Sequence, residues 1–276
     1  MLQQGRLKMP SSNILAEEKR PAAHPLLALL ELPSAVLDVI ALNAARPILR
    51  RAPKGDKHAV MVIPGFLGSD TYNKTLCKFL TRLGYDSSGW TLGRNLGPQN
   101  GVIEALEARL LAQYTASGDK VSLIGHSLGG LYARVLAQRN PNLVRQVISL
   151  GSPISESPDS GKAVAKLFKL LNGPPDPVLR ATLKIAPPMP TTAVYSHSDG
   201  IVHWRNALQR NGHAQCQNIA VYGSHSGLTV NATVWWLLAD RLAQAEGQWR
   251  KFEPSGSARR LYPICQNQLA TAEAAT

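Results

Sequence analysis

Short apolar runs alternate with stretches of helical periodicity from Lys57 onward. Five runs have the composition of buried strands, each followed by Gly, Pro or polar residues; they cover 59–63, 121–124, 146–150, 193–196 and 218–222. Apolar residues at helical spacing predict helices over 73–83, 100–114 and 230–242, and another directly after the run at 121–124. Strands that alternate with helices are typical of βαβ units, in which helices cover both faces of a mostly parallel sheet. The pattern therefore predicts an α/β domain over 57–250.

Two stretches break this alternation. Residues 152–190 contain eight prolines around a helix expected over 162–171, so this segment is predicted to be a small cap inserted above the sheet. Beyond residue 250 the chain becomes polar and rich in small residues, and we expect 251–276 to be a tail that buries little.

The first 56 residues form an extension with one amphipathic segment. Residues 26–42 are strongly apolar, but Glu31, Pro33 and Asp38 interrupt them, so the segment is not expected to span a membrane. At helical spacing its apolar and polar residues fall on two different sides; they are Leu26, Leu30, Leu37 and Ile40 on one side and Glu31, Ser34 and Asp38 on the other. We expect this helix to pack on the body of its own protein, and a helix lying on a membrane surface is the alternative.

Composition and charge narrow the class of protein. With 276 residues, of which 44% are hydrophobic, the chain can bury one core, so a single globular domain is expected. Cys77, Cys216 and Cys265 fit neither a disulfide framework nor a zinc hook, and the polar first 23 residues do not resemble a secretory signal; we expect a cytoplasmic protein. The net charge of +12 allows a peripheral contact with an anionic membrane surface, but the scattered basic residues do not predict nucleic-acid binding.

The clearest chemical signal is the segment Gly-His-Ser-Leu-Gly at 125–129. It follows a predicted strand and precedes a predicted helix, which is the context of a nucleophile elbow. In such a turn a strained backbone projects the serine hydroxyl from the edge of the sheet, and Gly125 and Gly129 leave room where a side chain would clash. The pattern predicts Ser127 as a nucleophile.

A serine hydroxyl needs a base and an orienting carboxylate, and in this type of sheet the chain order is Ser, acid, His. Asp199 follows the predicted strand at 193–196, where catalytic side chains of such sheets gather, and is the candidate acid. Asp159 and Asp176 are rivals in the right order, but both lie in the proline-rich segment and are not anchored to a strand.

Four histidines follow the nucleophile. His225 is the only one that comes after the last predicted strand, in a loop that leads into the helix at 230–242, so it is the candidate base. His197, His203 and His213 precede that strand, and a histidine in a loop is more often a solvated surface residue.

The same chemistry requires an oxyanion hole, which consists of two backbone N–H groups aimed at the carbonyl oxygen under attack. Leu128, the residue after the nucleophile, is expected to supply one of them. The loop at 64–68 follows an early strand, and Phe66, just past Gly65, is the candidate for the other donor, with Leu67 second.

Four segments together resemble the α/β-hydrolase superfamily, and in particular its bacterial lipase-like and esterase-like members; they are 64–68, 125–130, 198–202 and 224–228. The resemblance implies an eight-stranded, mostly parallel sheet, a triad of Ser127, Asp199 and His225, and an acyl-enzyme on the serine. Pro64 departs from many relatives, in which a histidine precedes the glycine of this loop, and this argues against a true triacylglycerol lipase. The stretch at 89–97 is similar to a segment of uncharacterised members and has no assigned mechanism.

The sequence therefore predicts a serine carboxylic-ester hydrolase that acts on esters with an apolar acyl group. Apolar residues in or beside the site loops are the candidate substrate-binding residues; they are Leu67, Ile154, Leu167, Leu171, Ile201, Val202 and Leu228. The mechanism needs no cofactor, and the sequence has no pattern of metal ligands. Two alternatives stay open, an acyltransferase that uses the same serine and a non-catalytic binding module on the same fold.

Overall fold

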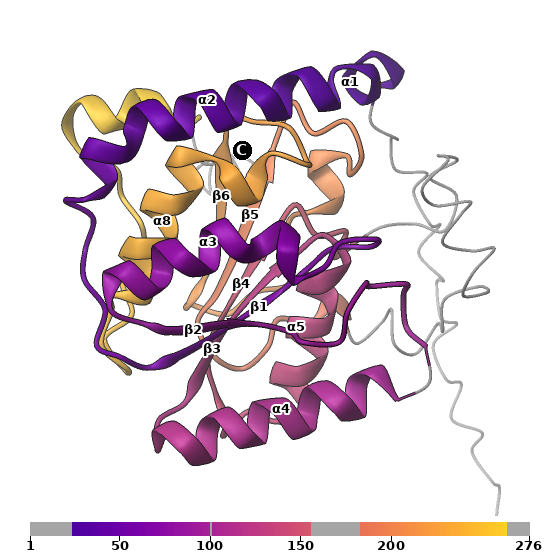
Figure 1. Ribbon diagram of the computed structural model, residues 1–276, viewed down its shortest axis with the longest axis vertical. Helices are drawn as coiled ribbons and strands as arrows, with labels where there is room; N and C mark the ends of the chain where they lie inside the picture. Colours follow the sequence, from indigo (N-terminus) through magenta and orange to yellow (C-terminus); the bar gives the residue numbers. More distant parts are fainter. Residues whose placement is uncertain (1–23, 100, 156–182, 264–276) are drawn as a thin grey trace, which may run out of the picture.

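Six parallel strands form the centre of the molecule (Figure 1). The computed structural model describes residues 24–99, 101–155 and 183–263. The strands are β1 (Ala59–Ile63), β2 (Asp86–Gly89), β3 (Val121–His126), β4 (Val144–Leu150), β5 (Thr191–Ser196) and β6 (Cys216–Val221). Their order across the sheet is β2-β1-β3-β4-β5-β6, and every neighbouring pair is parallel. This is the α/β architecture that the alternation of patterns predicts.

The strand count differs from the expectation in two ways. Strand β2 was not predicted, because its sequence, Asp-Ser-Ser-Gly, is polar and occupies the edge of the sheet. The resemblance implied eight strands, whereas the described residues contain six. The described residues before β1 form helices instead of further strands.

Helices cover both faces of the sheet. They are α1 (Pro25–Leu29), α2 (Glu31–Leu49), α3 (Asp70–Leu83), α4 (Val102–Ser117), α5 (Leu128–Arg139) and α8 (Ala232–Leu242), with short 3-10 turns η1 (Trp204–Asn206), η2 (Leu228–Val230) and η3 (Gly256–Leu261). Successive side chains of a strand point to opposite faces. Val60 and Val62 of β1 therefore join a core cluster with α2, α3 and α8, while Met61 joins a second cluster with α4 and α5. Figure 1 shows α2 and α4 at opposite ends of this layered arrangement.

The N-terminal amphipathic segment is helical but is divided at Leu30 into α1 and α2, and it packs on the body of the protein with its apolar stripe facing outward. Leu26, Leu30, Leu37 and Ile40 are exposed, whereas Glu31 is buried. The reason is that Glu31 and Asp38 find hydrogen-bond donors in the loops after β5 and β6. Helix α2 is therefore fixed by its polar side.

The two irregular segments are described only in part. Most of the expected cap, including the helix at 162–171, lies outside the described residues, and so do Asp159, Asp176, Leu167 and Leu171. The tail was expected to bury little, but this is wrong for its first part: Phe252 and Tyr262 are buried in the core cluster of α8, with their ring centroids 4.9 Å apart. Aromatic side chains spaced ten residues apart bury enough area to hold an irregular segment in place.

Candidate active site

Ser127 lies in a strained turn between β3 and α5. Its φ of 52° and ψ of −120° are sparsely populated for a residue with a side chain. A Cβ atom on Gly125 would overlap the backbone of Gly129, and one on Gly129 would overlap the carbonyl of Ile63. The two glycines thus permit the close approach of strand, turn and helix, and the observed geometry is that of a nucleophile elbow.

Asp199 and His225 form a buried pair in the loops that follow the neighbouring strands β5 and β6. The Asp199 Oδ2 atom lies 2.7 Å from His225 Nδ1. The second carboxylate oxygen, Oδ1, accepts hydrogen bonds from the N–H groups of Ile201 at 2.8 Å and Val202 at 2.6 Å. The carboxylate is therefore held by its own loop and aligns the imidazole through one oxygen.

The elbow and the acid–base pair meet at one edge of the sheet. His126, next to the nucleophile, places its Nε2 atom 2.9 Å from the carbonyl oxygen of His225. Gly151, directly after β4, lies against the pair of Asp199 and His225, since a Cβ atom there would be 3.1 Å from His225 Nδ1 and 3.2 Å from Asp199 Oδ2. The loops that carry the three sequence-predicted residues, Ser127, Asp199 and His225, thus meet at the same edge of the sheet.

His126 stays neutral in this arrangement. Burial lowers its pKa to about 3, and the nearby His225 acts in the same direction. A neutral ring that bonds a carbonyl through Nε2 carries its proton there, so the tautomer follows from the bond to His225. His126 thereby holds the backbone of His225, the candidate base, without adding a positive charge next to Ser127.

The candidate oxyanion loop at 64–68 is held by contacts with the stretch at 89–97, which had no assigned mechanism. The N–H group of Leu67 donates to the Asn95 carbonyl at 2.7 Å, so Leu67 is not the second oxyanion donor. Phe66 stays a prediction for that donor. Leu128 stands first in α5, where backbone N–H groups have no partner within the helix. The side chain of Asn95 donates to the carbonyl of Pro64 at 2.8 Å.

Asn95 is thus a residue that sequence reasoning missed. It is fully buried, and its backbone N–H also donates to the carbonyl of Gly68 at 2.8 Å. Asp70 at the start of α3 secures the same stretch, because its two oxygens accept the N–H groups of Trp90 and Thr91, each at 2.9 Å. The segment at 89–97 therefore fixes the candidate oxyanion loop through hydrogen bonds.

Glu31 is a second residue that was missed, since the sequence placed it only on the polar side of a helix. Its side chain is 6% exposed. The Oε1 atom accepts the N–H groups of Gly200 at 2.7 Å and His225 at 3.0 Å, and Oε2 accepts that of Ser226 at 2.9 Å. One carboxylate of α2 therefore joins the loop of Asp199 to the loop of His225.

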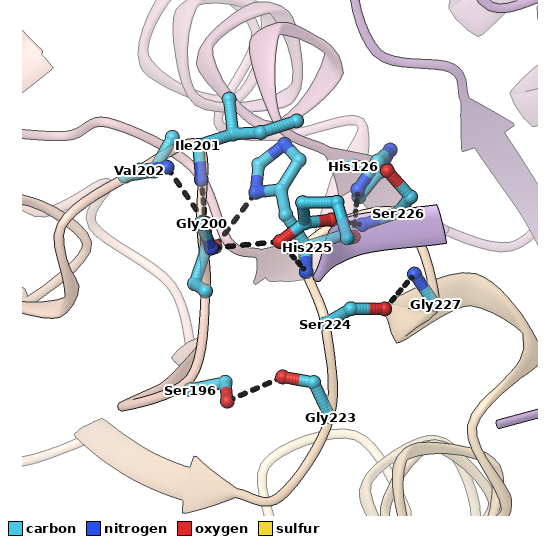
Figure 2. Close-up of polar contacts among 12 residues, drawn as sticks. His126, Ser196, Gly200, Ile201, Val202, Gly223, Ser224, His225, Ser226 and Gly227 are labelled. Carbon is cyan, nitrogen blue, oxygen red and sulfur yellow. Dashed lines mark hydrogen bonds and ion pairs between the residues drawn. The ribbon is translucent and has the colours of Figure 1, made fainter. Parts of the chain in front are cut away.

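Asp38, two turns further along α2, binds the same region. Its carboxylate accepts the Ser224 hydroxyl at 3.1 Å and the Asn231 side-chain amide at 2.8 Å. Burial raises the pKa of Asp38, and these hydrogen bonds oppose the shift. Ser196 adds a third tie, because its hydroxyl donates to the carbonyl of Gly223 at 2.6 Å (Figure 2).

The remaining histidines lie elsewhere. His197 packs against Trp204 with ring centroids 4.7 Å apart, and burial lowers its pKa. His213 makes a hydrogen bond to the carbonyl of Pro187. His203 caps the short turn η1 by accepting from the backbone of Arg205. None of these contacts involves Asp199.

The candidate substrate-binding residues separate into two groups. Leu67 is 44% exposed and Ile201 is partly exposed beside the site loops. Ile154, Val202 and Leu228 are buried, and Leu228 belongs to the main core cluster. These three pack beneath the loops, so the structure does not place them on an open substrate surface. Among the described residues there is no group of three or more His, Cys, Asp or Glu side chains arranged to hold a metal ion.

A second Ser–His–Asp arrangement occurs at the amino ends of the strands. His58 bonds Asp56 through Nδ1, and its Nε2 atom lies 2.8 Å from the hydroxyl of Ser122. Burial would raise the pKa of Asp56, but hydrogen bonds from His58 and Arg145 lower it to about 2. Ser122 is wholly buried within β3, so its hydroxyl cannot meet a substrate.

The fold and the elbow define an α/β protein of the hydrolase type, and comparison with known proteins agrees. A family profile described as "alpha/beta hydrolase fold" matches residues 59–199, about half of the chain. The chain belongs to the α/β-hydrolase family. No curated protein matches its sequence.

Two solved lipase structures share this fold. Aspergillus fumigatus lipase B is 16% identical with a TM-score of 0.54, over 70% of this chain and 54% of the lipase. The chain thus spans about half the length of that protein. A monoacylglycerol lipase from Paleococcus ferrophilus is 14% identical with a TM-score of 0.50, over 68% of this chain and 96% of the lipase. Similarity at these identities concerns the fold alone.

Proposed function

We propose that this chain is a serine hydrolase of carboxylic esters. The observation that supports the proposal is the strained turn of Ser127 at the start of α5, next to His126, whose ring bonds the backbone of His225 in the Asp199–His225 pair. A strained elbow exposes a hydroxyl at a helix N-terminus, where developing negative charge is stabilised. The fold of the two lipases is compatible with this activity.

In the proposed reaction the Ser127 oxygen attacks the ester carbonyl carbon while His225 takes the hydroxyl proton. The N–H groups of Phe66 and Leu128 bind the resulting oxyanion. The bond to the alcohol oxygen then breaks, and the alcohol leaves with the proton from His225. Water attacks the acyl-enzyme by the same steps, which releases the acid and restores Ser127. Asp199 stabilises the imidazolium and fixes its orientation.

The acyl group is proposed to be apolar, because Leu67 and Ile201 present partly exposed apolar side chains beside the site. Burying one methylene group contributes ~0.8 kcal/mol. The kcat/KM for a series of esters should then rise roughly fourfold per added methylene until the binding surface is filled.

Active-site labelling tests the proposal. A fluorophosphonate should add one label to the protein, detected by intact mass, and the label should be absent from Ser127→Ala. Ser122→Ala is the matched control and should label like the parent, since Ser122 lies buried in β3. A protein that neither labels nor hydrolyses any p-nitrophenyl ester from acetate to octanoate would be a binding module on a hydrolase fold.

A further inference from the structure

The exposed surface of α1 and α2 is unusually apolar for a helix that packs on its own protein. Nine of the seventeen strongly exposed large apolar side chains in the described residues lie between Leu26 and Ile48. Leu32 is 78% exposed, and Val36, Leu37 and Ile40 share its side of the helix at spacings of four, five and eight residues. We call these four residues the outer face of α2.

The inner side of the same helix is polar and fully engaged. Glu31 and Asp38 are seven residues apart, on one side of the helix, and bond the loops of Asp199 and His225. Leu42 and Leu49 continue this side into the core. The outer face cannot turn inward without breaking these bonds, so it needs another partner to remove it from water.

Charge identifies the kind of partner. Glu31 and Asp38 are the only acidic residues between positions 24 and 55, and both are bonded to the protein. Exposed basic residues follow the apolar stretch, namely Arg46, Arg50, Arg51 and Lys54. A helix surface that combines apolar side chains with basic ones and no acidic ones matches an anionic lipid interface.

The length of α2 would also permit a membrane-spanning helix, since a window of 18 of its 19 residues has a mean hydropathy of 1.4. Only 11% of that window is buried inside the protein. A spanning orientation would leave Glu31 and Asp38 in the hydrocarbon region without their loop partners, which is costly for two carboxylates. A helix in the plane of the interface keeps every one of these bonds.

We propose that the outer face of α2 docks this protein on an anionic membrane surface, with the helix lying parallel to the bilayer. Because the inner side of α2 is bonded to the acid and base loops, docking places the candidate active site close to the lipid. The docking itself does not depend on the proposed hydrolase activity.

Vesicle flotation of the full chain tests the proposal. Protein should float with vesicles of phosphatidylcholine containing about one third phosphatidylglycerol, and much less with pure phosphatidylcholine. Raising the salt to 1 M should weaken binding, because it screens the basic residues. A protein that stays at the bottom of the gradient with both vesicle types would overturn the proposal.

Two variants locate the contact. Leu32→Ser/Val36→Ser/Ile40→Ser should reduce partitioning at least tenfold, whereas Leu111→Ser, an exposed leucine on α4, should bind like the parent. Leu32→Trp keeps the face apolar and should show a blue-shifted emission that brominated lipids quench. Unquenched emission, or a dimer in light scattering that the triple variant dissociates, would show that lipid is not what covers this face.

Discussion

The molecule has a Ser–His–Asp set at each of two opposite edges of one sheet, and the two sets differ in the surroundings of the serine. At the amino edge, Asp56, His58 and Ser122 form a continuous hydrogen-bonded chain. Ser122, however, sits in regular β-structure and is fully buried. At the carboxyl edge, Ser127 stands in a strained turn before a helix.

This contrast shows that a hydrogen-bonded triad does not by itself define a nucleophile. Attack on a carbonyl requires an accessible hydroxyl and donors for the oxyanion. Of the two serines, Ser127 is the one that is partly exposed and that stands in a turn directly before a helix. The amino-edge arrangement instead satisfies buried polar groups, as Arg145 pairs with Asp56 at 2.8 Å and Tyr85 packs edge-on against His58.

Exchanging each serine for alanine should give the largest difference between the two edges. Ser127→Ala should lower kcat by ~10⁴-fold or more, because the hydroxyl is the proposed nucleophile. Ser122→Ala should leave kcat within a few-fold of the parent and cost ~1–3 kcal/mol of stability, since His58 loses a buried partner. Ester kinetics and urea unfolding measure the two effects. Equal losses of activity at both serines would remove the distinction.

His225 and His58 should differ in the same way as the two serines, with the larger loss of activity at the carboxyl edge. His225→Ala is expected to cost about as much in kcat as the loss of Ser127, because the members of one triad act as a unit. His58→Ala should mainly lower the unfolding midpoint, since it opens a buried polar network. If His197→Ala reduced turnover more than His225→Ala, the base would have been assigned to the wrong residue.

A smaller effect is expected when the carboxyl-edge arrangement is altered indirectly through Glu31, a positioning residue. Glu31→Ala removes the acceptor of three N–H groups and should lower kcat by roughly 10- to 100-fold with little change in KM, because a misplaced base slows chemistry more than binding. Glu31→Gln keeps one good acceptor oxygen and should recover part of the loss. Glu253→Ala, at an exposed glutamate, is the control.

The rate of fluorophosphonate labelling distinguishes two explanations for a slow Glu31→Ala variant, namely a misplaced His225 and a partly unfolded protein. Glu31→Ala should label slowly while it melts as one cooperative transition. Parent-like labelling together with a lower melting temperature would assign Glu31 to stability alone.

The smallest expected effect is a pH dependence of the free energy of unfolding, which arises from His58 at the amino edge. Burial lowers the pKa of His58 from 6.5, and the bond to Asp56 offsets only part of the shift. The unfolded chain therefore binds this proton more readily, so the free energy of unfolding falls as the pH drops below 6.5. In His58→Gln this fall between pH 7 and 5 should be shallower by ~1 kcal/mol. Urea titrations at each pH measure it, and an unchanged slope would place the titration elsewhere, for example at His126.

Features formed by residues that are neighbours in the sequence could be predicted, whereas features formed by residues far apart in the sequence could not. The elbow around Ser127 is made by neighbouring residues, so its glycines could be recognised directly. Strand β2 was missed because a polar edge strand has no apolar signature. The orientation of α2 was missed for a different reason, since the donors that bind Glu31 belong to loops far along the chain. Asn95 is of the same kind, because its partners Pro64 and Gly68 lie about thirty residues away.

The bonds of Glu31 also determine when the site can be completed. They join residues 169 to 195 positions apart, and contacts so distant form late, after the intervening chain has been ordered. On the ribosome, α2 emerges well before β6 has been synthesised. Glu31 therefore lacks its hydrogen-bond donors until the loops after β5 and β6 have formed. Ser127 likewise emerges about a hundred residues ahead of His225. A nascent or truncated chain therefore carries Ser127 without an aligned His225, and the proposed catalytic site can be completed only after the loop of His225 has folded against α2.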